Sequence, residues 1–201
     1  LMKLEGLTCQ LRQKRYRSYK GQTGKIAPNL LNRDFSATQP NRKWVTDVTE
    51  FKVLGQKIYL SPILDLFNGE VISYSLSASP SFLATIEMLK KAFRGLPEKV
   101  NLILHSDQGW QYQMKPYQKF LTEKGIQQSM SRKGNCYDNA VIESFFGLVK
   151  SEFFYNTLFE SVEDFQTKLT DYLDYYNNDR IKVKLKGLSP VVYRTQSNCV
   201  P

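Results

Sequence analysis

The chain has 201 residues, 41% of them hydrophobic and 23% charged, which is ordinary for a globular protein and long enough for one domain with an appendage. No apolar run approaches the roughly 20 residues that cross a bilayer, and the amino end lacks the pattern of a secretory signal. Three scattered cysteines argue against a disulfide framework or a zinc knuckle. We therefore expect a cytoplasmic protein with reduced thiols.

The net charge of +9 is concentrated at the amino end. Residues 1–46 hold ten Lys or Arg against two acidic residues, whereas the remainder is close to neutral. A basic arm on a neutral body is typical of a protein with a polyanionic partner, usually nucleic acid. The alternative is a solvated tail without a partner.

The first 43 residues show little periodicity. Residues 1–13 are expected to form a short helix, a glycine turn and the start of an extended arm. The helix is already under way at the first residue, which suggests a longer protein that has lost its start. Residues 14–43 interleave basic and aromatic residues with Gly, Pro and Asn. We expect them to form a linker that orders on its partner.

From Trp44 onward the pattern changes to alternating strands and helices. Three strands that pair antiparallel are followed by a helix, a strand, a helix, a strand and two helices. The strands are expected at 44–54, 57–67, 70–78, 100–107 and 126–131, and the helices at 81–93, 115–125, 139–154 and 161–177. This order predicts an α/β fold: a ribonuclease H-like, mixed five-stranded sheet flanked by helices, with a basic N-terminal arm and a C-terminal helix plus tail.

Three carboxylates occupy positions where a charge is costly unless it is paired or bound to metal. Asp47 lies in the middle of the first strand, Asp107 ends the fourth, and Glu143 lies near the start of the long helix. Hard oxygen ligands without His or Cys suit Mg²⁺ or Mn²⁺, and two such ions can drive phosphoryl transfer. Taken singly, each acid could instead be a surface residue or a salt-bridge partner. Glu50 faces the other side of its strand, and Asp65 could form a structural pair.

One strip of the long helix carries Glu143, Gly147 and Lys150 at helical spacing, between two apolar stripes. A glycine inside a helix costs about 1 kcal/mol relative to alanine, so Gly147 is expected to admit a close neighbour. The neighbour could be another helix, but Lys150 on the same face favours a DNA phosphate.

The spacing of these acids resembles that of retroviral integrases and many bacterial transposases. Fifty-nine residues separate Asp47 from Asp107, and thirty-five separate Asp107 from Glu143. The segments NRKWVTDVTEF, KIYLSPILDLF, HSDQGWQYQ, SMSRKGNCYDNAVIESFFGLVKSE and YYNNDRIKVKLKGLSP are similar to the two-frame insertion-sequence transposases, in the catalytic subunit called OrfB. The resemblance covers essentially the whole chain.

The resemblance implies a function and a set of roles. The chain would be a polynucleotidyl transferase for DNA cleavage and strand transfer, with Asp47, Asp107 and Glu143 holding two Mg²⁺ or Mn²⁺ ions. Lys150 would contact the element end. Residues 1–40 would be the remnant of a helix-turn-helix region with its basic linker, and residues 41–201 the integrase catalytic core. The implied partners are DNA, further copies of the chain and the first-frame protein OrfA.

Other polar residues keep two interpretations. His105 could support the site, although a hydrogen-bonded core histidine is the more common outcome. Trp110 and Tyr112 could stack on bases or pack in the core. We expect DNA contacts from the loop before the long helix and from the basic tail, where the candidates are Arg132, Lys133 and Asn135, then Arg180, Lys182, Lys184, Lys186 and Arg194.

Two other functions compete with an active transposase. A truncated copy could be a non-catalytic remnant that occupies element ends or forms mixed oligomers. A nuclease acting on RNA–DNA hybrids would share the fold, but the motif text fits it poorly.

Overall fold

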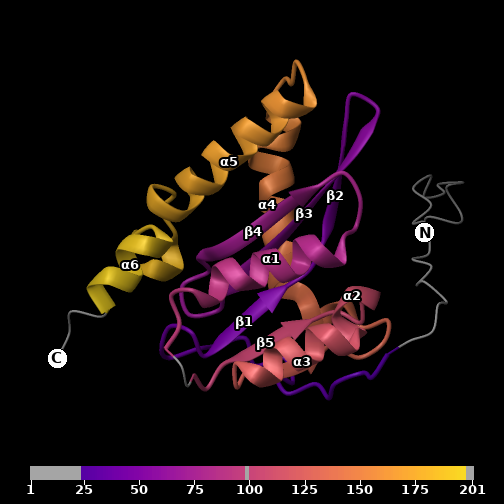
Figure 1. Cartoon of the computed structure of the whole chain (residues 1–201). Coiled ribbons are helices and arrows are strands. Elements are labelled where there is room, and N and C mark those ends of the chain that lie inside the picture. Colours follow the sequence, from indigo (N-terminus) through magenta and orange to yellow (C-terminus); the bar gives the residue numbers. More distant parts are fainter. Residues whose placement is uncertain (1–23, 98–99, 198–201) are drawn as a thin grey trace, which may run out of the picture.

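The computed structural model describes residues 24–97 and 100–197 (Figure 1). In chain order the strands are β1 (Lys43–Thr46), β2 (Thr49–Val53), β3 (Gln56–Asp65), β4 (Val71–Ser77), β5 (Ile103–Ser106) and β6 (Gln127–Met130). The helices are α1 (Phe82–Phe93), α2 (Trp110–Gln113), α3 (Lys115–Glu123), α4 (Ala140–Glu152), α5 (Val162–Asn178) and α6 (Pro190–Ser197). Three 3₁₀ turns complete the chain: η1 (Cys136–Asn139), η2 (Phe154–Asn156) and η3 (Val183–Leu185).

The strands form one mixed sheet. β3 pairs antiparallel with β1, β2 and β4, while β1, β5 and β6 run parallel to one another. The sheet has six strands rather than the expected five, because the first expected strand is interrupted at Asp47 and Val48. There the Asp47 Oδ1 accepts a hydrogen bond from the Val48 backbone N–H at 2.7 Å, a local contact that competes with strand pairing.

Helices cover both faces of the sheet, and each face has its own apolar core (Figure 1). On one face, α4 and α5 bury residues such as Ile142 and Leu169 against Val45 of β1. On the other, α1 and α3 bury residues such as Leu89 and Leu121 against Trp44. Adjacent strand residues point to opposite faces, so β1 contributes to both cores. None of the helices in the described part of the chain is long and apolar enough to span a membrane.

The N-terminal arm differs from the expected linker wherever the structure describes it. Leu31 is 2% exposed and belongs to the core. The Leu30 N–H donates to Ser129 Oγ at 2.9 Å, and the Met130 N–H donates to the Pro28 carbonyl at 3.2 Å. From residue 24 onward the arm is therefore packed along β6, an edge strand that it covers. The helix expected at 1–13 lies outside the described residues, and the domain boundary near residue 41 stays a prediction.

The basic tail is also more ordered than expected, because it contains α6. Arg194 of this helix forms ion pairs with Asp65 at 2.5 Å and with Glu70 at 2.6 Å. The Asp65 side chain is fully buried and also accepts from the backbone N–H groups of Asn41 and Phe67. The interpretation of Asp65 as a structural pair is thereby confirmed.

Replacement of Arg194 tests this attachment of the tail. Arg194→Met would leave the buried Asp65 carboxylate without its cationic partner, which should lower the free energy of unfolding by about 3 kcal/mol. Urea denaturation measures the loss. Lys119→Met is the control, since Lys119 pairs with Glu123 at 3.7 Å in solvent and should contribute less than about 1 kcal/mol. Equal losses in the two variants would contradict the structural role of Arg194.

Candidate functional site

Two parallel strands bring Asp47 and Asp107 together. In the pairing of β1 with β5, Thr46 stands opposite Ser106, and each strand then ends. Asp47 and Asp107 are the next residues, so they leave the sheet side by side at the same edge. The Asp107 Oδ1 accepts from the Gly109 N–H at 2.8 Å, which turns the chain immediately after the carboxylate.

The third acid, Glu143, lies in the first turn of α4. Ile142, Phe146 and Val149 bury the apolar side of this helix against the sheet. Glu143 is on the exposed side, on the same strip as Gly147 and the half-buried Lys150. The expected grouping of these three residues on one helix face is confirmed.

The carboxylates interact through their charges. Burial raises the pKa of Asp47 to about 7, and the negative charges of Asp107 and then Glu143 add to the rise. Hydrogen bonds from the Val48 N–H and the Asn139 side chain oppose it. Burial also raises the pKa of Asp107 and of Glu143. The three acids therefore form one unfavourable cluster of negative charge, which a cation would relieve.

The donor set fits a hard divalent cation, because it consists of carboxylate oxygens alone. The side chains as they lie are not gathered into a finished site: within residues 24–97 and 100–197, no group of three His, Cys, Asp or Glu is arranged to hold a metal ion. Proximity and charge thus support a metal site, and coordination itself stays a prediction.

Next to the carboxylates, the turn η1 is fixed by Asp138, whose side chain is fully buried. Arg132 binds its carboxylate through Nε and Nη2, each at 2.8 Å, and Arg33 and Asn29 of the N-terminal arm bind it at 3.0 Å. The hydrogen bonds from Arg132 are the main reason that the pKa of Asp138 lies well below its usual range. Arg132, predicted to touch DNA, therefore also has a structural role.

The predicted DNA contacts have different surroundings. Lys133 and Lys184 are exposed, and Asn135 Oδ1 accepts from the Tyr137 N–H at the start of η1. Arg180 instead forms a two-pronged ion pair with Glu152, with N···O distances of 2.8 and 2.5 Å. No observation tests DNA contact by these residues.

Phosphate contact by the basic tail stays a prediction, and only some of the basic residues of the tail are exposed. Besides Arg180 and Arg194, Lys182 is turned inward, with its Nζ 2.6 Å from the Tyr176 hydroxyl and 4.2 Å from the centre of that ring. Burial lowers the pKa of Lys182 to about 8. Lys184 and Lys186 are the two candidates of the tail that remain exposed.

The structure decides between the two interpretations for His105 and Tyr112, whereas base stacking by Trp110 stays a prediction. His105 is fully buried, with Nδ1 2.8 Å from Ser129 Oγ and Nε2 2.9 Å from the Asp138 carbonyl, so it is a hydrogen-bonded core histidine. Burial lowers its pKa. Tyr112 is fully buried against Tyr117 and is unable to stack on a base, whereas Trp110 is 40% exposed.

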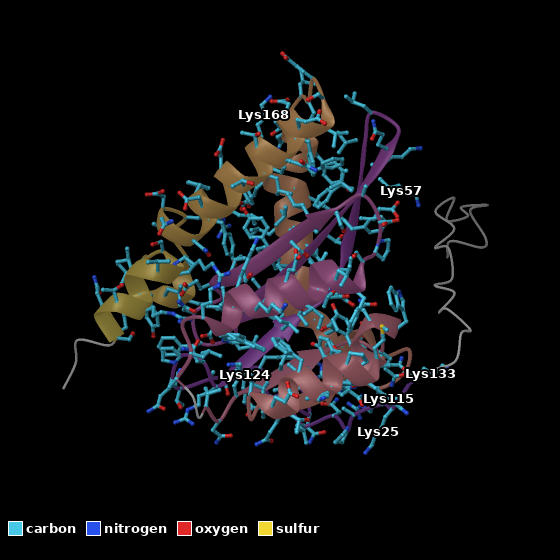
Figure 2. All side chains as sticks on the ribbon, viewed as in Figure 1. Lys25, Lys57, Lys115, Lys124, Lys133 and Lys168 are labelled. Atoms are coloured by element: carbon cyan, nitrogen blue, oxygen red, sulfur yellow. The ribbon has the colours of Figure 1, made fainter. Side chains whose placement is uncertain are left out.

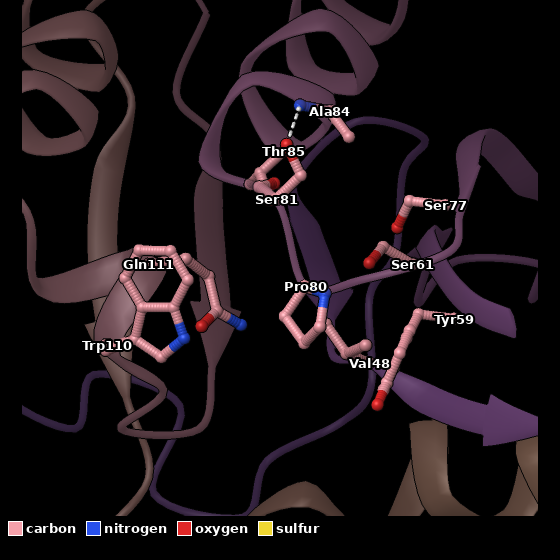
Figure 3. A pocket seen from close by; sticks show the side chains of 10 residues that line it. All are labelled: Val48, Tyr59, Ser61, Ser77, Pro80, Ser81, Ala84, Thr85, Trp110 and Gln111. Atoms are coloured by element: carbon pink, nitrogen blue, oxygen red, sulfur yellow. Dashed lines mark hydrogen bonds between the residues drawn. The ribbon is translucent and has the colours of Figure 1, made fainter. Parts of the chain in front are cut away.

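Trp110 lines a narrow pocket (Figure 3). Val48 and Gln111 also line it, and these residues belong to the segments that follow Asp47 and Asp107. The other wall includes Ser81, whose hydroxyl accepts from the Ala84 N–H and caps α1. The pocket therefore offers two aromatic residues, Trp110 and Tyr59, and several polar groups.

Sequence reasoning missed two residues of this region, Asp138 and Asn139. Asn139 is 4% exposed, and its Nδ2 donates to Asp47 Oδ2 at 2.8 Å. Both residues stand in the segment quoted for the family resemblance, directly before the helix that carries Glu143. Polar residues before a helix usually serve as caps, so nothing in their type indicated a contact with residues about 100 positions away.

The chain matches known families over most of its length. A family model described as the integrase core domain matches residues 37–136, and a second model of the same description matches residues 143–197. The chain is 56% identical over 197 residues to the putative transposase InsK for insertion sequence element IS150 of Escherichia coli, covering 98% of this chain and 70% of that one. An uncharacterized transposase-like protein of Haemophilus influenzae is also 56% identical, with 98% and 91% covered.

Solved structures show the same fold. The catalytic core domain of HTLV-2 integrase, solved in complex with magnesium in a trimeric form, aligns with a TM-score of 0.62 at 20% identity, covering 79% of this chain and 99% of that one. An integrase chain in the simian T-cell lymphotropic virus intasome aligns with a TM-score of 0.66 at 19% identity, covering 100% and 70%. The expected ribonuclease H-like arrangement is confirmed.

Removal of one charge from the cluster should stabilise the metal-free chain. Because the pKa of Asp47 is raised by folding from about 4 to about 7, its ionisation disfavours the folded state. The cost is absent below pH 4, grows between pH 4 and 7 and is complete above pH 7 (all bounds approximate). Asp47→Asn should therefore raise the free energy of unfolding at pH 8 in EDTA by up to about 4 kcal/mol, and by less at pH 5.

Urea denaturation of both chains at the two pH values measures this difference. Asp171→Asn, at an exposed position of α5, serves as the control and should change stability little at either pH. A gain from Asp47→Asn that is no larger at pH 8 than at pH 5 would contradict the raised pKa.

Proposed function

Because the chain belongs to the insertion-sequence transposases with an integrase core domain, which act in DNA transposition and integration, we propose that it cleaves and joins DNA strands with Asp47, Asp107 and Glu143 as its metal ligands. Polynucleotidyl transfer is the activity that this family implies. The residue roles and the metal dependence are the proposed part. Family membership also disfavours the alternative of a nuclease for RNA–DNA hybrids.

The observation that carries the proposal is the placement of Asp47 where the charges of both Asp107 and Glu143 act on it. Asp47 and Asp107 follow paired residues of adjacent parallel strands, and the charge of Glu143 reaches Asp47 from α4. Three carboxylates packed in this way are costly unless a cation lies among them. Mg²⁺ or Mn²⁺ suits such oxygen donors, and we propose two ions because the reaction has an attacking and a leaving oxygen.

When bound, such ions lower the pKa of an attacking water or hydroxyl and stabilise the charge that develops at the phosphorus. The protein's own contribution is positioning. Asp47 and Asp107 are fixed by the ends of β1 and β5, whereas Glu143 lies on a separate helix, in the first turn of α4. The exposed side of Glu143 is where a DNA phosphate would enter.

We propose that the DNA backbone follows the exposed strip of α4. A Cβ atom added to Gly147 would meet nothing within 4 Å, so no helix in the described part of the chain is the close neighbour expected there. We propose that an external partner comes close there, and Lys150, three residues further on, supplies a positive charge. Lys133, in the loop before η1, is a further exposed cation, and in the view of Figure 2 it lies toward the same end of the molecule as Lys25 and Lys115.

The oligomeric state and the protein partner are also part of the proposal. The integrase cores of similar fold were solved as a dimer and a trimer and within an intasome. We propose that this chain also works as a homo-oligomer on paired element ends, together with the first-frame protein OrfA. Arg132, Asn135, Arg180 and Lys184 stay candidate DNA contacts.

The catalytic assignment predicts the effect of three substitutions. Asp47→Asn, Asp107→Asn and Glu143→Gln should each lower Mg²⁺-dependent cleavage of element-end DNA by about 1000-fold or more, because each removes a ligand that contributes several kcal/mol to the transition state. The assay measures cleavage and joining of labelled ends with Mg²⁺, in the presence of OrfA.

Asp171→Asn, which removes an exposed carboxylate from α5, should retain full activity. Circular dichroism of each variant checks that the fold is intact. Full activity in any one of the three variants would remove that residue from the catalytic set, and activity that persists in EDTA would contradict metal dependence.

The DNA path predicts a salt-sensitive contribution from Lys150. Lys150→Gln should weaken binding to element-end DNA and reduce the slope of log affinity against log salt by about 1, since one phosphate contact is lost. Fluorescence anisotropy over a salt series measures both quantities. Lys90→Gln, at an exposed position of α1, should leave the slope unchanged. Equal slopes for wild type and Lys150→Gln would contradict the proposed path.

A further inference from the structure

We propose that Asn139 is a positioning residue that orients the Asp47 carboxylate for metal binding, and that the N-terminal arm holds Asn139 in place through the buried Asp138. This inference rests on the proposed function of Asp47. It adds a residue that holds the ligand and a contact that ties the arm to the chemistry.

The first step is the contact between Asn139 and Asp47. The Asn139 Nδ2 donates to Asp47 Oδ2 at 2.8 Å, while the Val48 N–H donates to Oδ1 at 2.7 Å. An ionised carboxylate only accepts hydrogen bonds, so the two donors together set the direction of the group and favour its charged form. Of these donors, Asn139 is the one supplied by another element, 92 residues away in the chain.

A second observation concerns the other side of the Asn139 amide. Asn139 is 4% exposed, and its Oδ1 is buried without a hydrogen-bond partner in the described part of the chain. A buried acceptor left unmatched costs about 1–3 kcal/mol, which is uncommon in a folded protein without a functional reason. The unmatched acceptor lies on a residue that already touches a proposed metal ligand, so this side of the amide is free to accept a hydrogen bond within the site.

The third step is the anchoring of Asn139 by its neighbour. Asp138 receives side-chain hydrogen bonds from Asn29, Arg33 and Arg132, and the Arg132 backbone N–H adds one at 3.0 Å. Its carbonyl lies 2.9 Å from His105 Nε2. Because both the side chain and the carbonyl of Asp138 are hydrogen-bonded, the backbone of the next residue, Asn139, is held in place.

The arm reaches this anchor by two routes. Asn29 and Arg33 bind the Asp138 carboxylate directly. The Leu30 N–H also donates to Ser129 Oγ, whose hydroxyl lies 2.8 Å from His105 Nδ1. The carbonyl of Asp138 accepts only, so His105 donates from Nε2 and Nδ1 accepts from Ser129. The arm, His105, Asp138 and Asn139 thus form one hydrogen-bonded connection that ends on Asp47.

Mn²⁺ binding to the folded chain tests the proposal without relying on activity. Binding is followed by the electron paramagnetic resonance signal of free Mn²⁺, and the site is defined as the binding that Asp47→Asn removes. Asn139→Ala should weaken this binding about tenfold or more, the usual effect of removing a group that orients a metal ligand. Arg33→Met, at the exposed end of the connection, should weaken it in the same direction but less. Asn178→Ala, an exposed amide on α5, is the matched control and should bind like wild type.

The cleavage assay adds a readout that a loss of stability would not produce. For Asn139→Ala, the Mg²⁺ concentration needed for half-maximal cleavage should rise about tenfold, and saturating Mg²⁺ should restore much of the rate. Should the variant fail to fold, the wild-type chain still provides a test: the side-chain amide resonances of Asn139 should shift when Mg²⁺ is added.

The outcomes separate this inference from the proposed function. Wild-type Mn²⁺ affinity in Asn139→Ala, or Asn139 resonances that do not respond to Mg²⁺ while binding at Asp47 is intact, would overturn the positioning role and leave the metal site standing. A wild-type chain without any binding that depends on Asp47 would overturn the metal site, and the positioning role with it.

Discussion

The structure depends on the parallel pairing of β1 with β5. This pairing sets Thr46 opposite Ser106 and ends both strands at the same edge, so the two following carboxylates emerge together. The ladder stops at Asp47 because its side chain binds the next backbone N–H. The same local contact therefore splits the first strand in two and directs the carboxylate away from the sheet. Placing the carboxylates at one edge of the sheet brings like charges together, and the raised pKa of Asp47 reflects this. A divalent cation would offset the repulsion.

A second constraint lies in the turn before α4. Asp138 is a buried carboxylate that gathers two arginines and an asparagine, so its charge is compensated rather than repelled. Asp47 and Asp138 thus lie within one region but have opposite electrostatic environments. The compensated acid is structural, whereas the uncompensated acids are the proposed metal ligands. The presence or absence of cationic partners therefore separates structural acids from proposed metal ligands. Residue type alone does not give this distinction.

Periodicity predicted the strands and helices well wherever one face of an element is buried. The helix expected at 139–154 is α4 with η2, and that expected at 161–177 is α5. It did not predict the break at Asp47, since a single side-chain contact leaves no periodic signal. The packing of the arm and the tail against the core was not expected, because their basic composition hides single residues such as the buried Leu31 and Arg194, which pairs with the buried Asp65. In the same way, charge counting placed Lys182 on the surface, whereas the fold turns it toward Tyr176.

The sequence by itself determined the family, the order of the elements and the choice of Asp47, Asp107 and Glu143 as candidate metal ligands. The spacing of these acids and the segments around them are properties of the chain alone. Only the tertiary structure decided which charges are compensated. Asp65 and Glu152 find their cations 129 and 28 residues away, and Asp138 binds Arg33, 105 residues away, besides the nearby Arg132. No local pattern encodes the longer separations. The contact between Asn139 and Asp47 belongs to the same class. Hydrogen bonds and ion pairs depend on distance in space and not on separation in the sequence. They can therefore be assigned only from the folded structure.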